Sequence, residues 1–197
     1  MKKIVFTFAF MIFTFGAFAR EITVSVGAGE NWKAKREPQF AVWLEDSAGN
    51  FVRTLYVTKK ASQKRWLFCP DNGRPESLPV WYHASKNNSA KNTEEIFKNE
   101  EGLDAVTNAT PKGGVMFNAL LENEKEFFIK AEFNTSFDYN DFYTKKNSDV
   151  NGQPSVVYFA KIPKNKEINP KDSGQEIVLD FLGSGSLDGS DGKIHQN

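Results

Sequence analysis

Short runs of β-branched and aromatic residues, each bounded by turn-forming residues, constrain this chain more than any other feature of its sequence. The turns Asp46–Asn50 and Glu122–Lys125 each separate two such runs, and we expect both to close antiparallel hairpins. About seven short strands in 197 residues predict an all-β fold, specifically an immunoglobulin-like antiparallel β-sandwich with Trp43 and Phe133 pointing inward. The predicted strands are 22–26, 40–44, 51–57, 114–121, 126–133, 156–162 and 177–182.

The first 19 residues have the pattern of a secretion signal peptide. Lys2 and Lys3 precede an apolar run over residues 4–15, and Ala17-Phe18-Ala19 forms a small-x-small cleavage site. A buried helix or a membrane anchor is the alternative, but the run is short for a hydrocarbon core of about 30 Å. We therefore expect residues 20–197 to form a single exported domain in the periplasm or another extracytoplasmic space, not spanning the membrane after cleavage.

Composition narrows the function classes. Lys+Arg and Asp+Glu number 25 each, so the chain lacks the basic footprint of a nucleic-acid-binding protein. Cys69 is the one cysteine, so no intramolecular disulfide can form. Its apolar neighbours favour an inert core residue over a catalytic thiolate partnered by His83. Without a nucleophile elbow, P-loop or paired-histidine spacing, we expect no catalytic residue, no metal site and no autonomous enzyme.

Two long connections interrupt the strand pattern. We predict no strand between residues 59 and 113, and an insertion loop of this length is usually functional. A short helix is predicted to start within 92–97. The second connection, 134–154, is rich in aromatic residues and could cover the first loop, cover a ligand, or pack against its own sandwich. Its aromatic residues are Phe137, Tyr139, Phe142 and Tyr143.

The segment Asp104–Gly114 reads DAVTNATPKGG and resembles the acceptor motif Asp-x-x-(Ser/Thr)-Gly-Ala-(Thr/Ser) of proteins modified by an extracytoplasmic flavin transferase. The resemblance implies that FMN is joined to Thr110 through a phosphoester bond. It makes Asp104 and Thr107 the preceding polar motif residues and Ala109 the small residue beside the acceptor. Asn108 stands where glycine is usual, and asparagine is the other residue that adopts positive φ most readily. An ordinary loop and an N-glycosylation sequon at Asn108 are the competing interpretations.

Two flanking motifs, Arg74–Trp81 and Asn151–Tyr158, occur in the same order around this segment in a bacterial family of predicted periplasmic proteins of unknown function. The chain is similar to that family from about Pro38 onward. The resemblance implies an exported immunoglobulin-like sandwich found beside membrane redox modules and flavin transferases. The family usually ends in a further strand, whereas we expect 183–197 to be a flexible tail or a truncated end, with a calcium loop at Asp188 and Asp191 as the weaker alternative.

These observations predict a periplasmic electron-transfer protein with covalent FMN, a flavin transferase as its modifying partner and a membrane redox protein as its electron partner. Trp81 and Tyr82 are the expected stacking partners of the isoalloxazine ring. The alternative is a cofactor-free, immunoglobulin-like binding module of the cell envelope.

Overall fold

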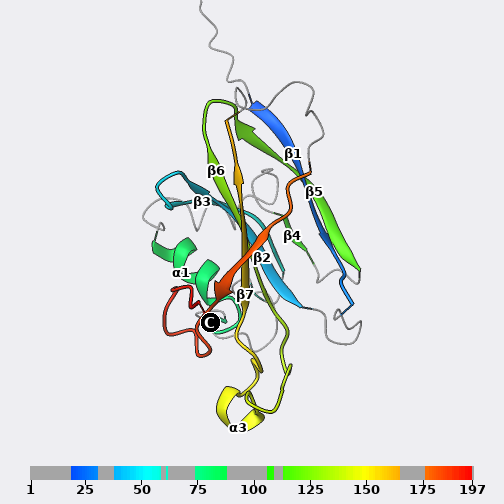
Figure 1. Ribbon diagram of the computed structural model, residues 1–197, viewed down its shortest axis with the longest axis vertical. Coiled ribbons are helices and arrows are strands. Elements are labelled where there is room, and N and C mark those ends of the chain that lie inside the picture. The colour runs from blue at the N-terminus through cyan, green and yellow to red at the C-terminus, as the bar shows by residue number, and fades with distance from the viewer. Residues whose placement is uncertain are drawn as a thin grey trace, which may run out of the picture.

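The computed structural model describes residues 19–30, 38–58, 61, 74–87, 106–108, 113–164 and 176–196. Its strands form two sheets that pack together (Figure 1). The smaller sheet pairs β1 (Ala19–Gly27) with β5 (Gly114–Glu122) in antiparallel register. The larger sheet has the order β4-β3-β2-β6-β7-β8 and is antiparallel except that β4 runs parallel to β3. Its strands are β2 (Gln39–Asp46), β3 (Phe51–Thr58), β4 (Val106–Asn108), β6 (Phe127–Asn134), β7 (Val156–Ile162) and β8 (Asp180–Ser184).

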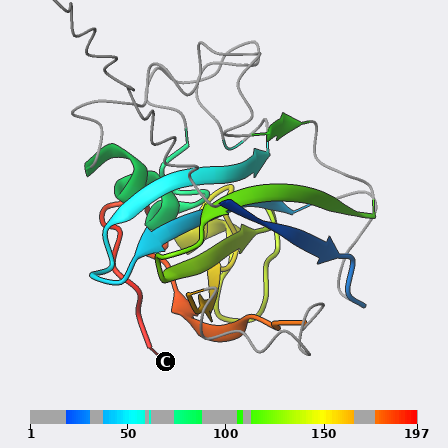
Figure 2. The same cartoon turned by 90° about the horizontal axis from the view of Figure 1, so that it is seen from above.

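Both faces of the larger sheet are covered, because side chains alternate between faces along a strand. Phe40, Val42 and Leu44 of β2 enter a first core beneath the smaller sheet. Ala41 and Trp43 enter a second core, which lies against helix α1 (Pro79–Asn87). Figures 1 and 2 show α1 and the β1–β5 pair on opposite sides of the larger sheet.

The all-β prediction is confirmed, and each predicted strand overlaps a strand of the structure, although β8 begins three residues later than predicted and ends at Ser184. Trp43 is fully buried in the second core, and Phe133 packs against the first. The smaller sheet has two strands and the larger sheet has six in the described part of the chain. The immunoglobulin-like arrangement of these strands stays an expectation.

The two predicted hairpins have different outcomes. At Asp46–Asn50 the hairpin forms, with Asp46 Oδ1 accepting the N–H groups of Ala48 and Asn50 at 2.9 Å each. The prediction for Glu122–Lys125 is wrong, because β5 pairs with β1 while β6 pairs with β2 and β7. Turn residues reverse the chain, but they do not decide which edge the next strand joins.

The 59–113 connection contains regular structure that the sequence did not predict. Helix α1 begins at Pro79, a residue favoured in the first helical turn, and β4 is only three residues long, too short for a period-2 pattern. The predicted helix start at 92–97, Cys69 and residues 1–18 of the predicted signal peptide lie outside the described residues.

The C-terminal segment is folded, so the expectation of a flexible tail is wrong for residues 183–196. Ser184 and His195 exchange two backbone hydrogen bonds of 2.9 and 2.8 Å, and Gly185 N donates to Ser155 O at 3.0 Å. The segment returns across the end of α1 (Figure 1).

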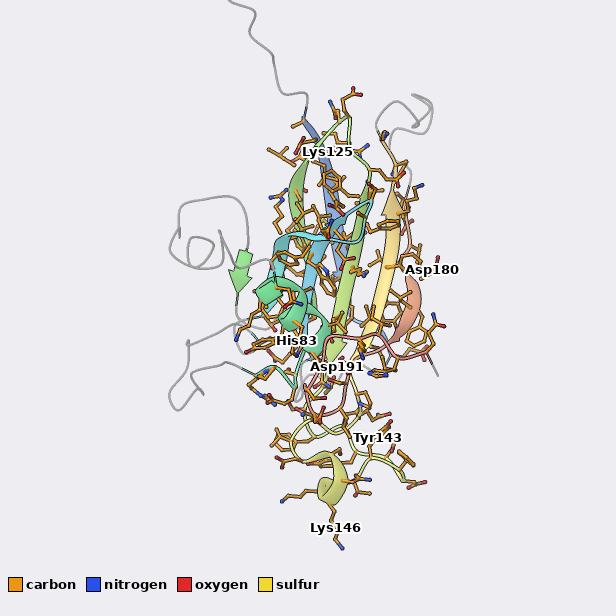
Figure 3. The ribbon with its side chains drawn as sticks, turned by 90° about the vertical axis from the view of Figure 1, so that its left-hand side faces the viewer. His83, Lys125, Tyr143, Lys146, Asp180 and Asp191 are labelled. Atoms are coloured by element: carbon orange, nitrogen blue, oxygen red, sulfur yellow. The ribbon has the colours of Figure 1, made fainter. Side chains whose placement is uncertain are left out.

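The aromatic loop 135–155 extends beyond the end of the larger sheet instead of lying on it, with α3 (Lys145–Ser148) at its tip (Figures 1 and 3). Its aromatic rings pair with one another, Phe137 with Tyr139 and Phe142 with Tyr143. Among the described helices, none has the length and apolar character needed to cross a membrane.

Candidate functional site

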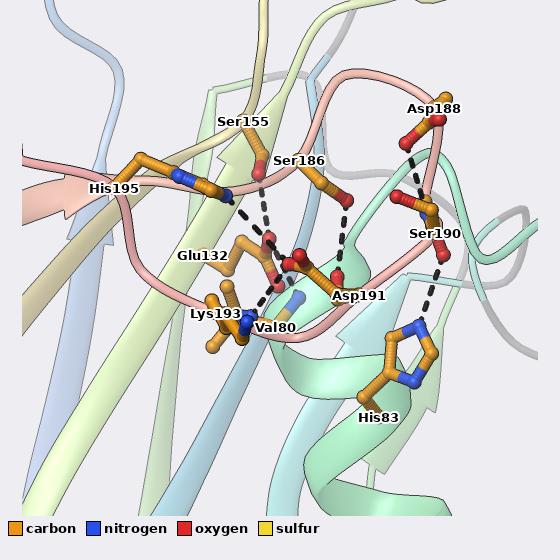
Figure 4. Close-up of polar contacts among 11 residues, drawn as sticks. Val80, His83, Glu132, Ser155, Ser186, Asp188, Ser190, Asp191, Lys193 and His195 are labelled. Atoms are coloured by element: carbon orange, nitrogen blue, oxygen red, sulfur yellow. Dashed lines mark hydrogen bonds and ion pairs between the residues drawn. The ribbon is translucent and has the colours of Figure 1, made fainter.

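A buried carboxylate, Glu132, links three separate parts of the chain (Figure 4). Its Oε1 accepts hydrogen bonds from Val80 N at 3.2 Å and from Ser155 Oγ at 2.6 Å. Its Oε2 accepts one from Trp81 N at 2.8 Å. Glu132 lies on β6 and Ser155 immediately precedes β7, so this carboxylate fastens the first turn of α1 to the middle of the larger sheet.

The first turn of a helix has backbone N–H groups without intrahelical partners, and a carboxylate is well suited to accept them. A second bond, from Trp81 Nε1 to Thr54 Oγ1 at 3.0 Å, ties the same turn to β3. Trp81 and Tyr82 are only 3% and 8% exposed and belong to the second core. The expectation that they stack on a flavin is therefore wrong, since neither presents an open ring face.

The two flanking motifs of the sequence meet around Glu132. Arg74 Nη2 donates to Asn151 Oδ1 at 3.3 Å, and Arg74 also pairs with Glu76 at 3.0 Å. Asn151 Nδ2 in turn donates to Leu187 O in the C-terminal segment at 3.3 Å. Segments 74–81 and 151–158 thus form one structural unit.

Sequence reasoning missed Glu132 itself. The available signal was its place in β6, where an acidic residue stands between Ala131 and Phe133 in a predicted strand. A charge in such a strand is ordinarily assigned to the solvent face, whereas here it faces α1.

Burial raises the pKa of Glu132 from 4.5 to about 7, against the opposing effect of its three hydrogen-bond donors. The folded chain then binds this proton more tightly than the unfolded chain, so the stability that this group contributes is greatest below pH 4.5 and is lost as the pH rises to about 7. The difference in pKa corresponds to about 3 kcal/mol of unfolding free energy at most. Urea unfolding across this pH range should show the decrease in unfolding free energy, and Glu132→Gln should make the unfolding free energy less dependent on pH. A variant with the same dependence on pH as the wild-type protein would contradict the assignment to Glu132.

A groove of about 580 Å³ runs between α1 and residues 190–194 of the C-terminal segment, where His83 and Asp191 lie close together (Figure 3). His83 Nε2 lies 2.9 Å from Gly189 O. On the floor, Glu45 pairs with Lys130 at 2.7 Å and also accepts Trp43 Nε1 at 2.9 Å, so these charges are satisfied within the protein. The groove has the size of a small-ligand site.

The acidic residues of the C-terminal segment stabilise turns. Asp188 Oδ1 accepts Ser190 N at 3.0 Å, and Asp191 Oδ1 accepts Lys193 N at 2.9 Å. Within the described ranges, no three His, Cys, Asp or Glu residues come together as a metal site.

The residues of the predicted flavin site are only partly described. Asp104, Ala109 and Thr110 lie outside the described residues. Thr107 and Asn108 belong to β4, where their Cα partners are Val57 and Thr58 of β3.

The chain beyond this motif enters the smaller sheet. Gly114 begins β5 with a φ of +117°, and a Cβ there would lie 2.3 Å from Val26 O of β1. The motif therefore connects the edge of the larger sheet to the start of a strand in the smaller one.

No protein-family model matches the chain, and no curated protein or solved structure matches it either.

Proposed function

We propose that this chain is an exported electron-transfer protein that carries FMN in phosphoester linkage to Thr110. The observation that carries the proposal is the position of β4 at the end of the strand order, with only β3 beside it in the part of the chain that the structure describes. Thr110 follows two residues after this edge strand. A segment at a sheet edge can enter the active site of a modifying enzyme without disrupting interior strand pairs.

The chain and the flavin have separate chemical roles in this proposal. In the proposed transfer, the Thr110 hydroxyl oxygen attacks the flavin-side phosphate of FAD and loses its proton, while the bond from that phosphate to the adenylate breaks, so that AMP leaves and FMN stays on the threonine. The bound flavin would supply the capacity to accept and release electrons. The chain supplies attachment and a fixed environment. A flavin transferase is the partner for attachment, and a membrane redox protein is the proposed electron partner.

One feature favours the rival function, a cofactor-free binding module. Phe142 of the aromatic loop is 73% exposed, and its backbone is held in place because Asn140 Oδ1 accepts the N–H groups of Phe142 and Tyr143 at 3.0 and 2.6 Å. An aromatic side chain held outward on an ordered loop is typical of a protein interaction site.

Intact mass decides between the two functions. Protein coexpressed with a flavin transferase should gain the mass of one FMN less one water, because a single hydroxyl is esterified. Thr110→Ala should abolish the gain. Thr23→Ala, which removes a threonine hydroxyl on the smaller sheet, should leave it intact.

The transferase must label a known acceptor in the same cells. If it does so while this chain keeps its unmodified mass, the flavin function is contradicted and the binding module becomes the better account. If the Asn108→Gly variant gains the mass of FMN while the wild-type chain does not, Asn108 is the residue that prevents attachment.

A further inference from the structure

The groove between α1 and the C-terminal segment has walls that close glycine contacts hold together. A Cβ at Gly192 would lie 2.5 Å from His83 Cβ, and a Cβ at Gly189 would lie 2.5 Å from Glu76 N, so a larger residue does not fit at either position. His83 Nε2 is the donor in its contact with Gly189 O, because a carbonyl oxygen only accepts. The segment is thus fixed against α1, and the groove is present before any ligand enters (Figure 4).

The floor of the groove offers hydrogen-bond donors. Lys130 Nζ pairs with Glu45 Oε2 at 2.7 Å, and the Lys130 side chain is only 17% exposed. Glu45 balances the charge of this ammonium and is its one partner in the part of the chain that the structure describes. An ammonium has three N–H groups, so two of them remain for an acceptor that enters the groove.

The walls of the groove offer hydrogen-bond acceptors. Asp191 accepts Lys193 N through Oδ1, and its second carboxylate oxygen has no hydrogen-bond partner among the described residues. His83 keeps Nδ1 as an acceptor when the ring is neutral, because its proton is on Nε2. Asn87, the last residue of α1, adds a carboxamide that both donates and accepts.

The charges that line the groove are balanced, with Lys130 and Lys193 against Glu45 and Asp191. Such a lining gives no net attraction to a ligand that carries a net charge. It does require a ligand that both donates and accepts hydrogen bonds, and a hydroxyl group does both. The C–H groups between hydroxyls can pack against the apolar part of the lining. The apolar residues of the lining are Val80, Ala84 and Ile194.

We infer that this groove is a binding site for an uncharged, hydroxyl-rich ligand of the class of mono- and disaccharides. Its volume of about 580 Å³ lies within the range of small-ligand sites, about 300 to 1,000 Å³. The site goes beyond the proposed function and does not depend on FMN, because the residues that form it lie on α1, β2, β6 and the C-terminal segment.

NMR of the full-length, unmodified protein labelled with ¹⁵N tests this site. The probes are glucose, galactose, mannose, maltose and cellobiose, which differ in hydroxyl orientation and in the number of rings. At least one of them should shift the amide signals of Ala84, Asn87 and Gly192 in a saturable manner, since these residues line the groove. Leucine, a zwitterion, and citrate, an anion, should leave these signals unchanged, because the charges of the lining are already balanced.

Two aspartate variants provide a matched comparison. Asp191→Asn keeps an oxygen for Lys193 N but replaces the second carboxylate oxygen with a donor, so the sugar should bind about five- to tenfold more weakly. Asp188→Asn is the control, because Asp188 Oδ1 accepts Ser190 N at 3.0 Å in the same segment but does not line the groove. Its affinity should equal that of the wild-type protein. Ala84→Phe should abolish binding by filling the groove.

Saturable shifts confined to the groove, weakened by Asp191→Asn and unaffected by Asp188→Asn, support the site. Four results would overturn it: no saturable shift with any of the five sugars, equal weakening in the two aspartate variants, binding that survives Ala84→Phe, or shifts caused by leucine or citrate instead of the sugars. None of these results bears on Thr110, so the flavin function is decided separately by intact mass.

Discussion

Glu132→Ala is expected to lower the free energy of unfolding by about 3 to 5 kcal/mol at neutral pH, a large part of the stability of an ordinary domain. The substitution leaves three buried donors, Val80 N, Trp81 N and Ser155 Oγ, without their acceptor. Each unsatisfied donor costs about 1 to 3 kcal/mol, partly offset by removal of a buried carboxylate. Urea unfolding followed by tryptophan fluorescence measures the loss, because Trp81 lies in the affected turn.

Glu122→Ala is the control for this experiment. Glu122 pairs with Lys125 at 2.9 Å, but its side chain is 65% exposed, so its removal should change stability by less than about 1 kcal/mol. Similar losses in the two variants would show that Glu132 does not hold α1 on the sheet.

The second large effect is expected from Gly185→Ala. A Cβ at this position would lie 2.4 Å from Ser155 Oγ, 2.6 Å from Pro79 Cγ and 3.0 Å from Glu132 Oε1. Because the first two distances are shorter than real Cβ contacts, the C-terminal segment or α1 must move, at a cost of about 1 to 3 kcal/mol. Thermal unfolding of the variant should show a correspondingly lower midpoint.

Gly27→Ala provides the comparison, since a Cβ at Gly27 meets nothing within 4 Å. The double variant Gly185→Ala, Ser155→Ala should lose less unfolding free energy than the two single variants together, because the new Cβ at position 185 would contact the Ser155 Oγ that the second change removes. If the loss of unfolding free energy in the double variant equals the sum of the two single losses, residues 185 and 155 do not share this contact.

The strands were predictable because their signal is local. A strand with one face in the core repeats apolar residues at every second position, and β7 begins and ends at the predicted residues. The turn at Asp46–Asn50 was predictable for the same reason, since Asp46 bonds backbone groups only two and four residues away. The assignment of FMN to Thr110 also comes from adjacent residues of the sequence, and it stays a prediction.

The Glu132 site required the tertiary structure. Its carboxylate meets Val80 and Trp81 across 52 and 51 residues of sequence, a pairing that no local pattern encodes. Composition was misleading at the C-terminus, where glycine and serine suggested a flexible tail. Gly185 instead allows the backbone to approach Ser155 and Pro79 more closely than any side chain could.

The sequence by itself determined where strands and turns form, because these depend on side-chain periodicity and on contacts between near neighbours. Only the tertiary structure decided that β5 pairs with β1, that Trp81 is buried and that Glu132 meets the first turn of α1. The physical reason is that pairing partners and burial depend on contacts between segments far apart in the chain. Those contacts exist only once the two sheets and α1 have packed together.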